Sequence, residues 1–112
     1  MEVEDLKKIL EEIEKSESSH FIITHGTYTM PDSARFLQAH LKNSKNTIIF
    51  TGSMTPMAEF TMSDGGFNLG YAVAKLEALD AGIYVAMNGC VFTPEEVVKI
   101  ISEGRFTSLF GE

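Results

Sequence analysis

Apolar residues recur along much of the chain with the spacing of helices. Residues 3–15 carry an apolar stripe at positions i, i+3, i+4 and i+7, which predicts an amphipathic helix with one buried face formed by Leu6, Ile9, Leu10 and Ile13. Residues 31–42 predict a second helix, because Pro31 fits a first helical turn. A third helix is predicted from Ser63-Asp64 to residue 79, with an apolar stripe of Leu69, Val73, Leu76 and Leu79.

Continuous apolar runs predict three buried strands. They begin near residues 20, 47 and 83, and the predicted helices separate them. This rhythm is typical of βαβ units, so we expect an α/β fold with an open, mainly parallel, doubly wound sheet of the Rossmann or flavodoxin type and helices on both faces. Asn88-Gly89 is a turn signal, after which Val91-Phe92 can pair back as a short hairpin.

The sharpest local signal follows that turn. Thr93-Pro94-Glu95-Glu96 combines a capping box with a proline at the first helical position, and Gly104 is typical of a helix stop. The segment predicts a fourth helix over residues 93–104. Its apolar positions are Val97, Val98, Ile100 and Ile101.

Composition and charge narrow the class of protein. The chain has 112 residues, enough for one domain with its own core, and 44% of them are apolar. The formal net charge is −7 and the basic residues are scattered, which argues against nucleic acid and anionic membranes as partners. The acidic start is unlike a secretory signal, and no apolar run approaches the length of a membrane span. A single cysteine, Cys90, suits a reducing compartment, so we expect a cytoplasmic protein.

Polar, small and hydroxylated residues follow each of the three predicted strands. In an open parallel sheet, ligands bind at the carboxyl ends of the strands, so these segments define the candidate site. They read His25-Gly26-Thr27-Tyr28-Thr29, Thr51-Gly52-Ser53-Met54 and Met87-Asn88-Gly89. A threonine hydroxyl there can act as a nucleophile only with a neighbouring base and preorganised donors for the oxyanion.

Three segments resemble the bacterial-type L-asparaginases. Ile23-Thr24-His25-Gly26-Thr27-Tyr28-Thr29-Met30 is similar to the His-Gly-Thr-Asp-Thr-Met segment of that family. Thr51-Gly52-Ser53-Met54-Thr55-Pro56, followed by Ser63-Asp64-Gly65-Gly66-Phe67-Asn68-Leu69, resembles a second family segment. Tyr84-Val85-Ala86-Met87-Asn88-Gly89 resembles a third, and the resemblance extends over residues 1–107.

The resemblance implies an amidohydrolase that cleaves a side-chain amide through a threonine nucleophile. By this resemblance Thr27 corresponds to one of two essential threonines and Lys99 to the catalytic lysine. A desolvated lysine loses its proton readily, which suits a base or proton relay. The same resemblance assigns substrate binding to Gly26, Tyr28, Thr51, Gly52, Ser53, Asn88 and Gly89. No cofactor and no metal are implied.

The chain departs from the family pattern in three places. Tyr28 replaces an aspartate, and a phenol with a pKa near 10 offers no permanent negative charge to a substrate ammonium. The Thr-Gly-Gly-Thr-Ile loop that follows the family's first strand has no counterpart here, nor has the C-terminal domain. We therefore expect residues 1–112 to be a partial N-terminal α/β domain with altered or absent activity. Because the first strand is absent, we expect homo-oligomerisation or association with a missing N-terminal segment.

Other interpretations stay open from the sequence. The chain can be a non-catalytic binding or assembly module derived from the asparaginase fold, or a small phosphate-binding α/β domain. His25 reads as a structural hydrogen-bonding residue, and Ser63 and Asp64 as helix caps. Met54, Met57 and Met62 read as loop packing or as an oligomer contact.

Overall fold

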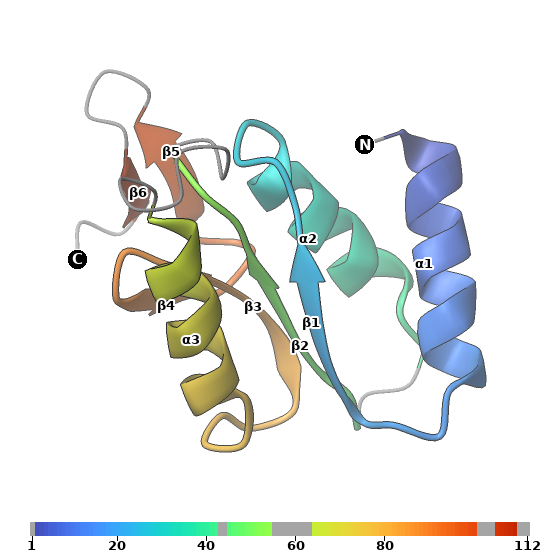
Figure 1. Cartoon of the computed structure of the whole chain (residues 1–112). Coiled ribbons are helices and arrows are strands. Elements are labelled where there is room, and N and C mark those ends of the chain that lie inside the picture. Colours follow the sequence, from blue (N-terminus) through green and yellow to red (C-terminus); the bar gives the residue numbers. More distant parts are fainter. Residues whose placement is uncertain (1, 43–44, 55–63, 101–104, 110–112) are drawn as a thin grey trace.

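The computed structural model describes residues 2–42, 45–54, 64–100 and 105–109 (Figure 1). The helices are α1 (Val3–Lys15), α2 (Met30–His40) and α3 (Gly65–Leu76). The strands are β1 (His20–Thr24), β2 (Thr47–Thr51), β3 (Gly82–Met87), β4 (Cys90–Phe92), β5 (Val97–Ile100) and β6 (Arg105–Ser108). None of the helices in these ranges has the length and apolar character needed to cross a bilayer.

The main sheet has the order β1-β2-β3-β4, with the first three strands parallel and β4 antiparallel. Ile22 pairs with Ile49, and Ile49 pairs in turn with Tyr84, so the three parallel strands are aligned across the sheet. Asn88 and Gly89 have φ angles of 54° and 72°, the left-handed region that a tight hairpin turn requires. The predicted fold class and the β3–β4 hairpin are confirmed.

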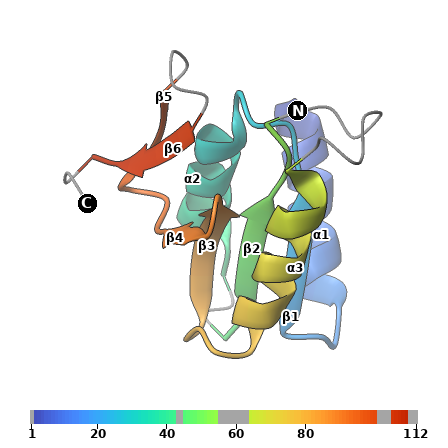
Figure 2. The same cartoon turned by 60° about the vertical axis from the view of Figure 1, so that its left-hand side comes forward.

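Helices cover both faces of the main sheet (Figures 1 and 2). Because side chains alternate along a strand, Phe50 and Val85 point toward α1 and α2, whereas Ile49 and Ala86 point toward α3. The first face holds the larger cluster, to which α2 contributes its fully buried Leu37.

The buried face of α3 differs from the prediction. Leu69 and Val73 are 42% and 55% exposed, whereas Gly65, Asn68 and Ala72 face the sheet. Small residues at this spacing let the helix approach the strands closely, and the bulky side chains then turn outward. The predicted stripe is therefore wrong at Leu69 and Val73, whereas its other two members, Leu76 and Leu79, pack against the cluster on this face of the sheet.

The helix predicted over residues 93–104 is wrong. Pro94, Glu95 and Glu96 form a single turn, in which the N–H groups of Glu96 and Val97 both donate to the Thr93 carbonyl, at 3.2 and 3.3 Å. From Val97 the chain is extended, and β5 pairs antiparallel with β6 in a separate hairpin. Residues 101–104 lie outside the described ranges.

The capping box predicted at Thr93 and Glu96 is present, but it closes a single turn and does not begin a helix. Glu96 Oε2 accepts from the backbone N–H of Thr93 at 2.9 Å and from its hydroxyl at 2.8 Å, as in a capping box. Its other oxygen accepts from the Ser108 hydroxyl at 2.8 Å, which fastens the turn to β6. The β-branched run that follows favours a strand once it has a partner to pair with.

The Glu96 contacts predict acid sensitivity of this hairpin. The N–H of Thr93, the Ser108 hydroxyl and the Thr93 hydroxyl hold the pKa of Glu96 below its usual 4.5. The stabilisation is therefore complete above pH 4.5 and is lost as the pH falls through the lower, folded-state value. Glu96→Gln should lower the melting temperature at neutral pH and should flatten its decline in acid, measured by circular dichroism between pH 3 and 7. Equal slopes for both proteins below pH 4.5 would contradict the assignment.

Candidate active site

Two adjoining cavities lie at the carboxyl ends of β1 and β2. The first, of about 390 Å³, is lined from β1, β2 and α3 by Thr24, His25, Gly26, Thr51, Gly52, Ser53, Gly65 and Leu69. The second, of about 590 Å³, is lined by Asp5 of α1 and by residues 24–29. The loop after β1 thus borders both, and it carries the first of the predicted site segments.

His25 holds this loop in place. A carbonyl only accepts hydrogen bonds, so Nδ1 of His25 carries the proton and donates to the Gly26 oxygen at 2.5 Å. Nε2 forms a hydrogen bond with the hydroxyl of Ser33, on α2, at 2.8 Å, and in the neutral tautomer it accepts from that hydroxyl. The imidazole is buried and meets the Phe50 ring edge to face, with centroids 5.9 Å apart. His25 is a structural residue here, in agreement with its sequence interpretation.

The two residues that follow Gly26 have opposite environments. Thr27 is 9% exposed, and Tyr28 is 75% exposed. Both line the larger cavity, and Asp5 of α1, whose carboxylate accepts from the Glu2 N–H at 3.3 Å, lines it as well. A buried hydroxyl beside an exposed phenol therefore replaces the hydroxyl and carboxylate pair of the family motif.

A polar network joins the loop after β2 to the start of α3. Asp64 Oδ1 accepts from the Ser53 hydroxyl and from the Met54 N–H, both at 2.8 Å. Its Oδ2 accepts from the side-chain amide of Asn68 at 3.0 Å. The same Nδ2 group of Asn68 donates to the Gly52 carbonyl at 2.9 Å.

The predicted capping role of Asp64 is wrong. Asp64 occupies the N-cap position of α3, but its carboxylate makes no capping hydrogen bond and binds the loop after β2. Ser63, Met57 and Met62 lie outside the described residues.

Asn68 also reaches the end of β3. Its Oδ1 accepts from the backbone N–H of Asn88 at 3.0 Å, and its side chain has no exposed surface. Thr51 makes a parallel link, since its hydroxyl donates to the Ala86 carbonyl at 2.8 Å. The predicted site residues Gly52, Ser53 and Asn88 are thus held in one network of hydrogen bonds, and Thr51 makes a separate link from β2 to β3. Gly89 completes the turn beside the ring of Phe67.

Gly52 lies where two strand ends approach closely. A Cβ atom at this position would be 2.2 Å from the His25 carbonyl oxygen, well inside van der Waals contact. The loops after β1 and β2 can therefore lie side by side only because residue 52 has no side chain.

Lys99 lies on β5, opposite Phe106, and not on a helix as predicted. The start of β5 is fastened to α2 by Arg35, which donates from Nε to the Pro94 carbonyl at 2.8 Å and from Nη2 to the Val97 carbonyl. Helix α2 directly follows the Thr27 loop, and Figure 1 shows β5 at the same end of the molecule as that loop. The side chain of Lys99 is outside the described atoms, and its role stays a prediction.

Comparison with known proteins identifies the family of the chain. The family model described as "Asparaginase, N-terminal" matches residues 1–108. The chain belongs to the asparaginase family. L-asparaginase 2 of Escherichia coli (strain K12) is 36% identical over 96 residues, which cover 83% of this chain and 26% of that protein.

Solved asparaginases share the fold. The thermostable L-asparaginase from Thermococcus kodakarensis superposes with a TM-score of 0.86 and 29% identity, covering 96% of this chain and 34% of that one. The probable cytoplasmic L-asparaginase from Campylobacter jejuni gives a TM-score of 0.75 and 32% identity, covering 94% and 34%. The chain therefore spans about a quarter to a third of the length of these asparaginases.

Two residues that join different elements around the candidate site were given no role in the sequence analysis. Asp5 was read only as part of an amphipathic helix, yet it borders the Thr27 cavity. Asn68 was noted within a matching segment but was given no role. The sequence did contain a signal for Asn68, because it is a polar amide on a largely apolar predicted helix, directly after Gly65-Gly66-Phe67.

The central position of Asn68 predicts a large loss of stability on Asn68→Asp. The change keeps the shape but turns a donor into an oxygen that faces the Gly52 carbonyl and the Asp64 carboxylate. Loss of a buried hydrogen bond combined with like-charge repulsion should lower the free energy of unfolding by roughly 3 kcal/mol, measured by urea denaturation. Asn88→Asp makes the same chemical change at an exposed turn and should cost less than about 0.5 kcal/mol. Similar losses in the two variants would remove the special role of Asn68.

A second prediction concerns the close approach at Gly52. Gly52→Ala should destabilise the chain by about 1–3 kcal/mol, because the added methyl group overlaps the His25 carbonyl. Gly70 in α3 has no atom within 4 Å of an added Cβ, so Gly70→Ala should instead stabilise by roughly 1 kcal/mol through helix propensity. Thermal unfolding of both variants gives the sign of each effect. A stabilised Gly52→Ala protein would show that the two loops are not packed as described.

Proposed function

We propose that this chain is an amidohydrolase-type domain in which the Thr27 hydroxyl attacks a side-chain amide. Attack on the amide carbon forms an ester with Thr27 and releases ammonia, and water then hydrolyses the ester to the free acid and the threonine. The observation that supports this proposal is the position of Thr27. It is largely buried in the loop that borders both cavities, within the segment that resembles the asparaginase motif.

The surrounding residues fit such a reaction. The loop at Gly26 and Thr27 leads into the N-terminus of α2, where backbone N–H groups and the helix dipole favour developing negative charge. Lys99 is the proposed base or proton relay for the hydroxyl. Its strand is held against α2 by Arg35, which supports its placement at this end of the fold.

Substrate binding is assigned to the rims of the two cavities. Gly26, Gly52 and Ser53 line the smaller cavity together with Thr51, and Tyr28 lines the larger one. Asn88 and Gly89 act by shaping the site through Asn68. A small amide or amino-acid-like molecule is the proposed substrate, and no cofactor is needed for this chemistry.

A second function has a specific observation in its favour. Tyr28 is highly exposed at the position where the family motif has an aspartate, so the motif carboxylate is missing. A site that keeps the cavities but lacks this charge can bind a ligand without turning it over. We therefore retain a non-catalytic binding or assembly module as the alternative, and we propose that activity in this chain alone is reduced or altered.

The deciding experiment is ammonia release from L-asparagine and L-glutamine. If Thr27 is the nucleophile, Thr27→Ala and Thr27→Val should lose at least about a hundredfold in rate, because neither can form the ester. Thr27→Ser keeps a hydroxyl and should retain measurable turnover. Circular dichroism should show that all three variants are folded.

The outcomes separate the two functions. Equal rates for Thr27→Val and the wild-type chain would remove Thr27 from the mechanism. A wild-type rate at the level of the blank, combined with saturable amide binding by calorimetry, would favour the binding module instead.

The compartment is also a proposal. An exposed, unpaired Cys90 suits a reducing environment, and the matched Campylobacter protein is titled a probable cytoplasmic L-asparaginase. A matched Haemophilus influenzae relative is named a probable periplasmic L-asparaginase, so the names of the relatives point to both compartments. We propose the cytoplasm for this chain, to be checked by fractionation of cells that express the natural gene.

A further inference from the structure

Leu69 is a large apolar side chain that the packing of α3 leaves exposed. It is 42% exposed, because Asn68 and Ala72 take the positions of the helix that face the sheet. The side chain lines the smaller of the two cavities at the carboxyl ends of β1 and β2. Val73, four residues later and 55% exposed, is not among the lining residues of that cavity. The exposure of Leu69 thus gives the cavity a surface that Val73 does not supply.

Leu69 differs in character from the other described residues that line this cavity. Those residues are glycines, residues with a hydroxyl group and the buried His25. Their polar groups can orient an amide, but they offer little apolar surface. Leu69 therefore forms an apolar wall of the cavity, against which the methylene groups of a ligand can leave water.

The smaller cavity adjoins the larger one at Gly26. Both cavities are lined by Thr24, His25 and Gly26. Apart from the two chain neighbours of Gly26, no atom of the described residues lies within 4 Å of the point where a Cβ atom of residue 26 would be. The space beside Gly26 is therefore open, and one elongated molecule has room to reach from the Thr27 side to the Leu69 side.

We propose that Leu69 determines specificity by binding the aliphatic chain of an amide whose reacting end lies beside Thr27. The chain passes Gly26 and places its methylene groups against Leu69. The position of the reacting end rests on the proposed function of Thr27, whereas the apolar contact with Leu69 does not. The ligand class is primary amides that carry a straight carbon chain.

The apolar contact sets a measurable preference for longer chains. Acetamide, propanamide and butanamide form a suitable series, because their polar end is the same. Affinity should rise by up to about fourfold for each methylene group that reaches Leu69, which corresponds to about 0.8 kcal/mol.

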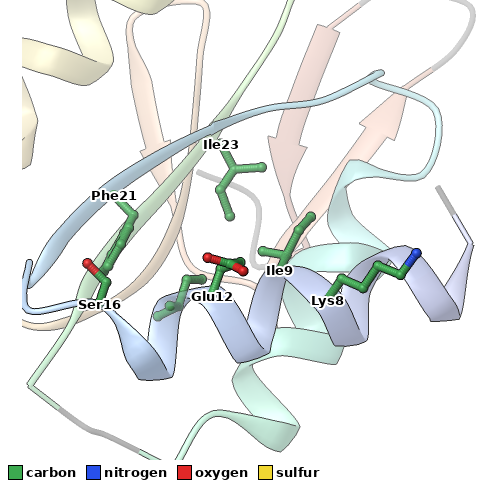
Figure 3. Close-up of a pocket in the computed structure, with 7 residues that line it drawn as sticks. Lys8, Ile9, Glu12, Ser16, Phe21 and Ile23 are labelled. Atoms are coloured by element: carbon green, nitrogen blue, oxygen red, sulfur yellow. The ribbon is translucent and has the colours of Figure 1, made fainter.

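A second apolar pocket of the molecule serves as an internal reference. It lies between α1 and β1, with Ile9 extending from the helix and Phe21 and Ile23 from the strand (Figure 3). Its volume of about 400 Å³ is close to the 390 Å³ of the smaller cavity, but its described lining includes none of the predicted site residues. Non-specific binding of aliphatic chains would therefore appear at this pocket as strongly as at Leu69.

The test is an NMR titration of the whole chain with the three amides. The wild-type chain should show saturable shifts at Gly26 and at the Leu69 methyl groups, with an affinity that rises along the series. Leu69→Ala should abolish the rise. Val73→Ala removes an exposed apolar side chain from the same helix and should keep the rise, and circular dichroism should show that both variants are folded.

A further variant tests the passage beside Gly26. Gly26→Ala narrows the space between the two cavities, and it should weaken the binding of butanamide more than that of acetamide. The change causes no backbone strain, because the φ angle of Gly26 is not in the positive range that favours glycine. Equal losses for the two amides would contradict a chain that passes this residue.

Three results would overturn the role of Leu69. They are the same rise in affinity in Leu69→Ala as in the wild type, no saturable shift at the Leu69 methyl groups with any of the amides, and equally large shifts at Ile9 and Ile23. Failure of the proposed function gives a different result. If the wild-type chain released no ammonia from butanamide, while the affinity still rose along the series only when Leu69 is present, Thr27 would lose its role and Leu69 would keep its own.

Discussion

The structure depends on one constraint, which is that three parallel strand ends must meet around the side chain of Asn68. Its amide donates to the Gly52 carbonyl after β2 and accepts from the Asn88 N–H after β3. Gly52 in turn allows the loop after β1 to approach, because no side chain stands between it and His25. With no exposed surface, Asn68 has no water to replace these partners, so the contacts are worth more than similar ones at the surface.

The parts of the fold that could be predicted from the sequence are those that depend on apolar patterns alone. Strands β1, β2 and β3 lie where continuous apolar runs placed them, because a strand covered on both faces needs apolar side chains at every position. Helix α1 has the predicted bounds because its one buried stripe has a strict helical period. The buried face of the first turns of α3 was missed because Asn68, and not an apolar residue, meets the sheet there, whereas the predicted Leu76 does pack against it.

The β5–β6 hairpin is a second element that local sequence patterns did not predict. A capping box and a proline predict a helix start equally well whether one turn or several follow. The outcome depends on pairing between Val97 and Ser108, and on Glu96 bonding to Ser108, both of which join residues more than ten positions apart. The same holds for the candidate site. Its three segments could be identified from the sequence, but the hydrogen bonds of Asp64, Asn68 and Arg35 that join different elements could not.

The carboxyl end of β1 leads into the Thr27 loop, which borders two cavities. The central claim is that these cavities form a ligand site for a small amide. NMR titration with L-asparagine and L-glutamine tests it most directly. The account predicts saturable shifts at residues 24–29 and at Gly52 and Ser53. Saturable shifts confined to α3 or to the β5–β6 hairpin would contradict it, as would none at millimolar ligand.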